Sequence, residues 1–246
     1  MAKYRIMFSK GDSVKYISHL DLAKLMHRAF RRAGIQVAYS EGFNPHPKMA
    51  LASALRLGTT SSAEYLDVEL EKEMSRLDIC SRLGESLPSG LQIKEVREID
   101  KETPPVMATV NAAAYRLVFK RVTKNSDALK ILQDLLGEDQ ILILRNTKKG
   151  EKEVDIRPLI YCADVIKQDD TSAVVDVLLG ASDQGTARPE EVASLLCEKG
   201  LCENEENMSL CRIGLYRRYP DGSTRTPFEV LSKESLVNPA PPAYKE

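Results

Sequence analysis

The chain has 246 residues, of which 43% are hydrophobic and 29% are charged, a composition typical of one or two globular domains. It contains no apolar run of about 18 residues, so we expect no transmembrane helix, and its N-terminus enters an alternating pattern at once, so we expect no signal peptide. The net charge of −1 conceals an uneven distribution: residues 1–60 carry ten Lys or Arg against three Asp or Glu. The total charge therefore does not indicate polyanion binding, whereas the first sixty residues alone are clearly basic.

The first hundred residues predict six elements in the order β-α-β-β-α-β. Alternating apolar residues predict a strand over residues 3–9. Ser18 and Asp21 have the spacing of a capping box and begin a helix that ends at Gly34. The remaining elements are strands at 51–57, 66–70 and 91–99, and a helix from 75 to 87 between the last two.

The same order of elements then repeats. Residues 101–113 contain two adjacent prolines and are expected to be a linker, and residues 221–246 are expected to be an irregular tail. Residues 114–220 again predict β-α-β-β-α-β, with an extra strand pair around 152–167. The predicted fold is therefore α+β, with two tandem ferredoxin-like domains (1–100 and 114–220) built on antiparallel sheets.

The first predicted helix carries a basic face. At 100° per residue, the side opposite its apolar stripe gathers four cations, with His27 beside them: Lys24, Arg28, Arg31 and Arg32. Such a face is typical of contact with phosphates, where each cation displaces condensed counterions. It is equally typical of a solvated helix, whose last turns favour basic residues through the helix dipole.

The loop from Tyr39 to Lys48 combines aromatic, imidazole and ammonium groups on a backbone stiffened by two prolines. Tyr39 or Phe43 could stack on a base, and His46 could act as a general base or a hydrogen-bond donor. The alternative is a structural loop in which Phe43 fills the core and His46 is exposed.

Histidine and cysteine spacings predict no metal site. The three histidines have no i, i+4 pair, and no cysteine joins them at ligand spacing. We expect His19 to be partly buried and to link the helix start to the nearby loop, with Asp21 and Asn44 as further supporting residues. Five cysteines, odd in number and scattered, predict thiols and a reducing cytoplasm, with no disulfide framework.

Three runs in the first domain carry a family resemblance: residues 16–22, 28–34 and 39–48, joined by shorter runs at 52–58, 64–68 and 154–160. Over roughly residues 3–217 the chain resembles the bacterial radical-SAM-linked family, a domain of unknown function. In that family the domain is fused behind a radical SAM enzyme or encoded as a separate protein beside one, and this chain resembles the separate form. The resemblance implies a radical SAM enzyme as partner, and it brings no cofactor or catalytic residue.

Three hypotheses follow. The first, which we favour, is a non-catalytic accessory protein that binds RNA, a tRNA or rRNA, for a radical SAM enzyme. The second is a metal-independent endoribonuclease that uses His46 or His19, with Lys48 stabilising charge, by analogy with tandem ferredoxin-like RNA-processing proteins. The third is a protein–protein adaptor. For RNA binding the expected contacts are Lys24, Arg28, Arg31, Arg32, Tyr39, Phe43, His46 and Lys48.

Overall fold

The chain folds into a mixed α+β structure with mostly antiparallel strand pairing. The computed structural model describes all residues except 148–149, 184, 204–207 and 238–246, and its described part contains four α-helices. The chain divides into two compact units: unit 1 comprises residues 1–111 and 214–246, and unit 2 comprises residues 112–213. Unit 2 therefore interrupts unit 1 in the sequence.

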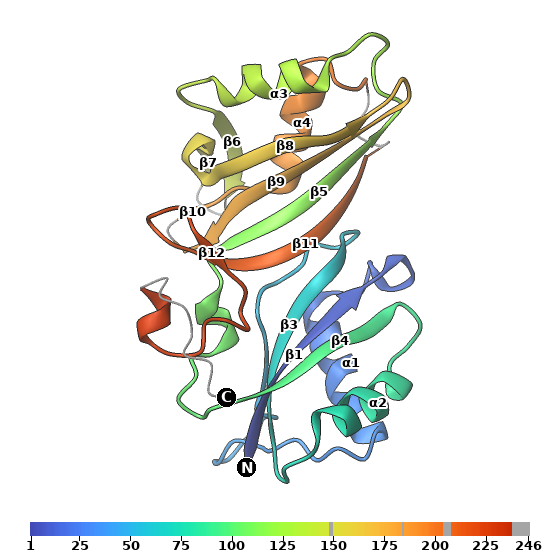
Figure 1. Cartoon of the computed structure of the whole chain (residues 1–246), viewed down its shortest axis with the longest axis vertical. Helices are drawn as coiled ribbons and strands as arrows, with labels where there is room; N and C mark the ends of the chain where they lie inside the picture. The colour runs from blue at the N-terminus through green and yellow to red at the C-terminus, as the bar shows by residue number, and fades with distance from the viewer. Residues whose placement is uncertain (148–149, 184, 204–207, 238–246) are drawn as a thin grey trace. The chain divides into compact units, whose positions relative to one another are not determined.

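Unit 1 has the predicted order of elements: β1 (Ala2–Lys10), α1 (His19–Arg32), β2 (Met49–Leu51), β3 (Thr60–Leu70), α2 (Arg76–Ser86) and β4 (Leu91–Ile99). Its strands lie in the order β2-β3-β1-β4, and each pair is antiparallel. Figure 1 shows β3, β1 and β4 side by side. Tyr4, Ile6 and Phe8 alternate along β1 and are fully buried in one core with residues of α1 and α2. The strand expected at 51–57 is shorter and earlier, because the chain leaves the ladder after Leu51 and turns through Gly58 at φ +82°.

Residues 101–111 of the expected linker and the expected tail belong to unit 1, where they cover the sheet face opposite the helices, whereas residues 112–113 begin the first strand of unit 2. Residues 101–113 include a 3-10 helix, η2 (Val106–Thr109), and the C-terminal segment includes β12 (Thr224–Arg225) and η5 (Glu234–Leu236). Phe228 is buried, and its ring meets the ring of Tyr65 edge-on at 5.2 Å. The expected tail is therefore buried at Phe228 and Val230 and held as far as Leu236, whose carbonyl accepts a hydrogen bond from Arg217, while residues 238–246 lie outside the described part.

A fully buried arginine holds these segments on the sheet. Arg5 on β1 donates from Nε and Nη2 to the two carboxylate oxygens of Asp67 on β3, at 2.7 and 2.9 Å. Its guanidinium also donates to main-chain carbonyls of both covering segments, those of Pro104, Pro227 and Val230. A single side chain thus joins four stretches of chain that are far apart in sequence.

Unit 2 contains β5 (Ala112–Lys120), α3 (Ala128–Leu136), β6 (Leu142–Thr147), β7 (Gly150–Asp155), β8 (Ile160–Gln168), β9 (Ser172–Ser182), β10 (Gly185–Thr186), α4 (Pro189–Glu198) and the first part of β11 (Met208–Arg218). In its sheet β5 lies between β9 and β11, and both β8 and β10 pair with β9 (Figure 1). The strand pair expected around 152–167 differs in its pairing. Residues 142–147 and 150–155 pair as the separate two-stranded sheet β6–β7, whereas β8 joins the main sheet.

The two units repeat a specific cross-strand pair. Arg5 on β1 stands directly opposite Asp67 on β3, and Arg116 on β5 stands directly opposite Asp176 on β9. Like Arg5, Arg116 donates from Nε and Nη2 to the two carboxylate oxygens of its partner Asp176, at 2.8 and 2.7 Å. The two pairs differ in burial, because the Arg5 side chain is 0% exposed and the Arg116 side chain is 43% exposed.

One disulfide corrects the expectation that the cysteines remain thiols. Cys197 lies in the last turn of α4, and Gly200, at φ +99°, reverses the chain so that the Cα atoms of Cys197 and Cys202 lie 4.6 Å apart. The two sulfur atoms are bonded, whereas Cys80, Cys162 and Cys211 are free.

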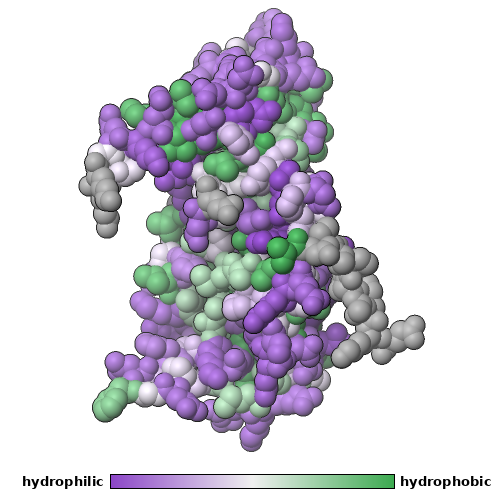
Figure 2. Space-filling model, turned by 90° about the vertical axis from the view of Figure 1, so that its left-hand side faces the viewer, coloured by the Kyte–Doolittle hydropathy of each residue, from purple (hydrophilic) through white to green (hydrophobic). Residues whose placement is uncertain are grey.

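On the face shown in Figure 2, hydrophilic side chains dominate and hydrophobic ones gather in smaller patches. None of the described helices is both long enough and apolar enough to span a membrane.

Candidate functional site

Helix α1 begins with the predicted cap. The Ser18 hydroxyl accepts a hydrogen bond from the Asp21 backbone N–H at 3.2 Å and donates to the Asp21 carboxylate at 2.7 Å. The helix buries Leu22, Met26 and Phe30 against the sheet. Because this stripe faces the core, the basic side chains on the opposite side face solvent.

Three of the four predicted cations surround one hollow. We call it the cationic groove; its volume is about 500 Å³, and it lies between α1 and the turn after α2. Arg32 is fixed there, because its Nη2 donates to the main-chain carbonyl of Ser86 at 2.6 Å. Arg28 is exposed, and within the described ranges no hydrogen bond or ion pair engages its guanidinium. The lining residues are Ile17, Asp21, Lys24, Leu25, Arg28, Arg32 and Pro88.

One carboxylate offsets part of this charge. The hydrogen bond from Ser18, helped by the positive charges of Lys24 and Arg28, lowers the pKa of Asp21 below its usual value. Asp21 is therefore ionised at neutral pH, and its carboxylate lies 3.6 Å from the Lys24 ammonium. Arg31 is exposed on the same helix and does not line the groove. The cationic groove therefore keeps a net positive charge, because three cations line it against the single carboxylate of Asp21.

The loop after α1 is tied to the helix at its base. The Tyr39 hydroxyl lies 2.8 Å from His27 Nε2, and the two rings meet edge-on. Ser40 and His46 close the loop through two hydrogen bonds, from Ser40 N–H to the His46 carbonyl and from His46 N–H to the Ser40 hydroxyl. The side chains beyond this closure, Phe43, Asn44 and His46, are exposed. Phe43 therefore does not fill the core, contrary to that part of the structural alternative, whereas His46 is exposed as the alternative expected.

Lys48 is placed differently from the other predicted contacts. Its ammonium lies 3.0 Å from a carboxylate oxygen of Glu69 on β3, and it does not line the cationic groove. Its charge is therefore already compensated by a neighbour. This arrangement lends nothing to the idea that Lys48 stabilises charge in an RNA-cleavage reaction at His46.

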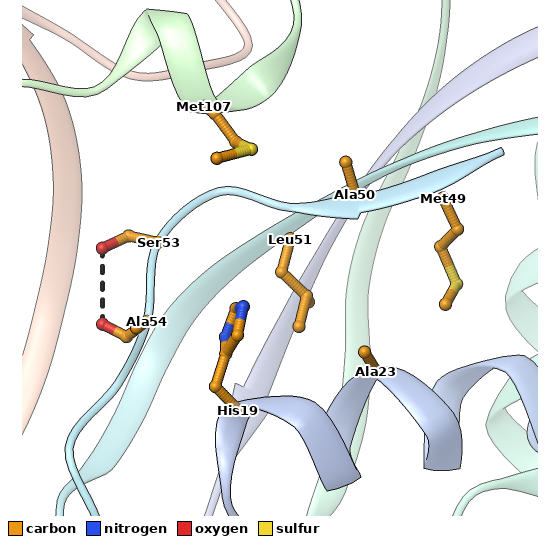
Figure 3. Close-up of a pocket in the computed structure, with 8 residues that line it drawn as sticks. All are labelled: His19, Ala23, Met49, Ala50, Leu51, Ser53, Ala54 and Met107. Atoms are coloured by element: carbon orange, nitrogen blue, oxygen red, sulfur yellow. Dashed lines mark hydrogen bonds between the residues drawn. The ribbon is translucent and has the colours of Figure 1, made fainter. Parts of the chain in front are cut away.

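His19 lines a second hollow, on the other flank of α1. This cavity of about 240 Å³ lies among α1, β2 and η2, and Figure 3 shows the imidazole reaching into it below Met107. The sequence did not reveal this cavity, because Met107 comes from the segment expected as a linker. Across the described ranges, no three His, Cys, Asp or Glu side chains group as ligands for a metal ion.

Comparisons with known proteins identify a family. The model of the family DUF2344, described as an uncharacterized protein conserved in bacteria, matches residues 3–189. Among curated proteins, none matches the chain.

Two solved structures resemble the chain at low identity. One chain of a Cbf5-Nop10-Gar1 complex is 11% identical, with a TM-score of 0.46; the match covers 86% of this chain and 48% of that one, so this chain spans about half its length. An unknown protein from Galdieria sulphuraria is 13% identical, with a TM-score of 0.24 and coverage of 85% and 95%. Both TM-scores lie below 0.5, so neither likeness assigns an activity to this chain.

Proposed function

We propose, from the premise that this chain belongs to the DUF2344 family of uncharacterised bacterial proteins, that it is a non-catalytic RNA-binding accessory protein of a radical SAM enzyme. The observation that carries the RNA-binding part is the cationic groove, where Lys24, Arg28 and Arg32 converge beside one helix. A row of cations along an exposed helix suits the phosphates of a nucleic-acid backbone. The radical SAM partner rests on the family resemblance of the sequence, as does the choice of a tRNA or rRNA.

The three cations offer different kinds of contact. Arg32 is held by the Ser86 carbonyl, so its position costs little ordering on binding. Arg28 has its guanidinium exposed and can form a bidentate contact with a phosphate. Lys24 acts as a point charge once the phosphate competes with Asp21 for it. The exposed ring of Phe43 adds a surface on which a base can stack.

As part of the same proposal, we assign a ferredoxin-like fold to each unit. In unit 1 the antiparallel order β2-β3-β1-β4, with both helices on one face, supports it. In unit 2 the corresponding order is β8-β9-β5-β11, and the two-stranded sheet β6–β7 is an addition between its first helix and β8. The repeated Arg–Asp pair supports a duplication of one unit.

A filter-binding assay tests the RNA part. We expect a structured RNA such as bulk tRNA to bind with an affinity that falls steeply with salt, and the double variant Lys24→Glu/Arg28→Glu to weaken binding and flatten that salt dependence. Each lost phosphate contact should reduce the slope of log affinity against log salt by roughly 0.7 to 0.9. The matched control is Lys94→Glu/Lys101→Glu, which makes the same charge change at exposed sites outside the groove. Equal loss in both double variants, or no binding at low salt, would refute the proposal.

A protein–protein adaptor is the second candidate. The observation that favours it is the exposure of large apolar side chains around α1: Tyr16 is 74%, Leu20 71% and Phe43 fully exposed. Co-purification with the radical SAM enzyme that persists after nuclease treatment, and that Leu20→Ser abolishes, would favour this function over RNA binding.

A further inference from the structure

The cavity beside His19 is lined mostly by apolar side chains, and its polar side chains are the His19 imidazole and the Ser53 hydroxyl, which donates to the Ala54 carbonyl. Ala23, Met49, Leu51 and Met107 make its lining mostly aliphatic and thioether (Figure 3). His19 is half-buried, and no hydrogen bond or ion pair to its imidazole occurs in the described part of the chain. A wholly apolar ligand would cover the imidazole and leave its nitrogens unpaired, which costs free energy. The walls therefore favour a ligand that is flat and apolar on its faces and polar at its edge.

A nucleobase has this chemistry. Its π-faces can pack on the methionine thioethers, which make favourable contacts with aromatic rings. Its edge carries the donors and acceptors that an imidazole can pair with. The volume of about 240 Å³ lies below the range of drug-sized sites, so the cavity holds one ring system and not a larger ligand.

The cavity and the cationic groove share α1. His19 and Ala23 lie on the β2 flank of the helix, whereas Arg28 and Arg32 lie on the α2 flank. Lys24 follows Ala23 directly and projects about 100° further around the helix, onto its exposed side. A strand whose phosphates cross this exposed side would bring its bases to the mouth of the cavity.

We infer that the His19 cavity receives one unstacked base of the RNA strand whose backbone α1 holds. This inference rests on the proposed function and deepens it, since it assigns base contact and backbone contact to opposite flanks of one helix. The two contacts differ in what they recognise. The groove binds the charged phosphates, so its contribution does not depend on the base and falls with salt, whereas the mostly apolar cavity contacts the base.

The test compares two probes of equal charge, a twelve-nucleotide oligo(A) RNA and the same backbone carrying abasic residues throughout. Fluorescence anisotropy gives both affinities for the full chain, for His19→Ala and for Ala23→Leu, which fills the cavity. We expect each variant to weaken oligo(A) binding about tenfold, leaving the abasic affinity and the salt slope unchanged. The control is Leu77→Ala, which removes an exposed apolar side chain on α2. Thermal unfolding confirms that each variant is folded.

Two outcomes overturn the inference and leave the proposed function standing. In one, the cavity variants bind oligo(A) as tightly as the parent; in the other, they lose affinity equally for both probes. A parent protein that binds neither probe at low salt overturns the proposed function as well. If the cavity variants keep RNA binding and lose a radical SAM partner, the cavity is a protein contact and the inference is wrong.

Discussion

Replacing Arg5 should unfold unit 1 far more readily than replacing its counterpart in unit 2. Arg5→Met removes a side chain that is 0% exposed and leaves the Asp67 carboxylate, itself 8% exposed, without its cation. Breaking a buried pair in this way costs roughly 3–5 kcal/mol. Arg116→Met breaks the same bidentate geometry at a position that is 43% exposed, where pairs contribute about 1 kcal/mol or less.

Urea unfolding followed by circular dichroism measures the difference. With a typical urea dependence, we expect the midpoint of unit 1 in Arg5→Met to fall by about 2 M, and limited proteolysis to cut within residues 226–230. The double variant Arg5→Met/Asp67→Leu should recover much of the loss, because it leaves no unpaired charge behind. Equal shifts in Arg5→Met and Arg116→Met, or no recovery in the double variant, would refute this reasoning.

Three further predictions concern single contacts. Ser18→Ala should cost unit 1 about 1 kcal/mol in urea unfolding, since it removes the cap of α1. Hydrogen bonds from Thr171 and Ser172 hold the pKa of Asp169 well below its usual value in the folded protein. These bonds therefore stabilise unit 2 fully above the pKa of Asp169 in the unfolded chain, and their stabilisation is lost as the pH falls through the pKa of the folded state. In Asp169→Ala the stability of unit 2 should therefore fall less steeply as the pH is lowered, which calorimetry at a series of acidic pH values measures. In denaturant, thiol titration should find three reactive cysteines before reduction and five after it, because Cys197 and Cys202 are bonded.

Local signals in the sequence predicted the order of elements and most of α1. The Ser18 cap, the apolar stripe and the basic face all depend on residues within a few positions of each other, so periodicity reveals them. The same reasoning grouped Arg31 with Lys24, Arg28 and Arg32, and of these four only the last three line the groove.

Long-range contacts account for what the sequence did not predict. Residues 104–106 and 227–230 have no strand or helix periodicity, and their place on the sheet depends on hydrogen bonds to Arg5, about a hundred or more residues away. Lys48 was grouped with α1 by its position in sequence, whereas a carboxylate on β3 fixes it. The Cys197–Cys202 bond depends on a chain reversal at Gly200, which the spacing of five residues does not reveal.

The interrupted sequence of unit 1 has a consequence for its synthesis. During translation every residue of unit 2 is synthesised before residues 214–237, so the sheet of unit 1 still lacks the C-terminal part of its cover when the sequence of unit 2 is complete. Until then Arg5 lacks the carbonyls of Pro227 and Val230, and Tyr65 lacks the ring of Phe228. A chain truncated after residue 213 should therefore hold a protease-resistant unit 2 beside residues 1–111 that proteases cut readily, because the segment that completes the first sheet is made only after the whole of the second unit.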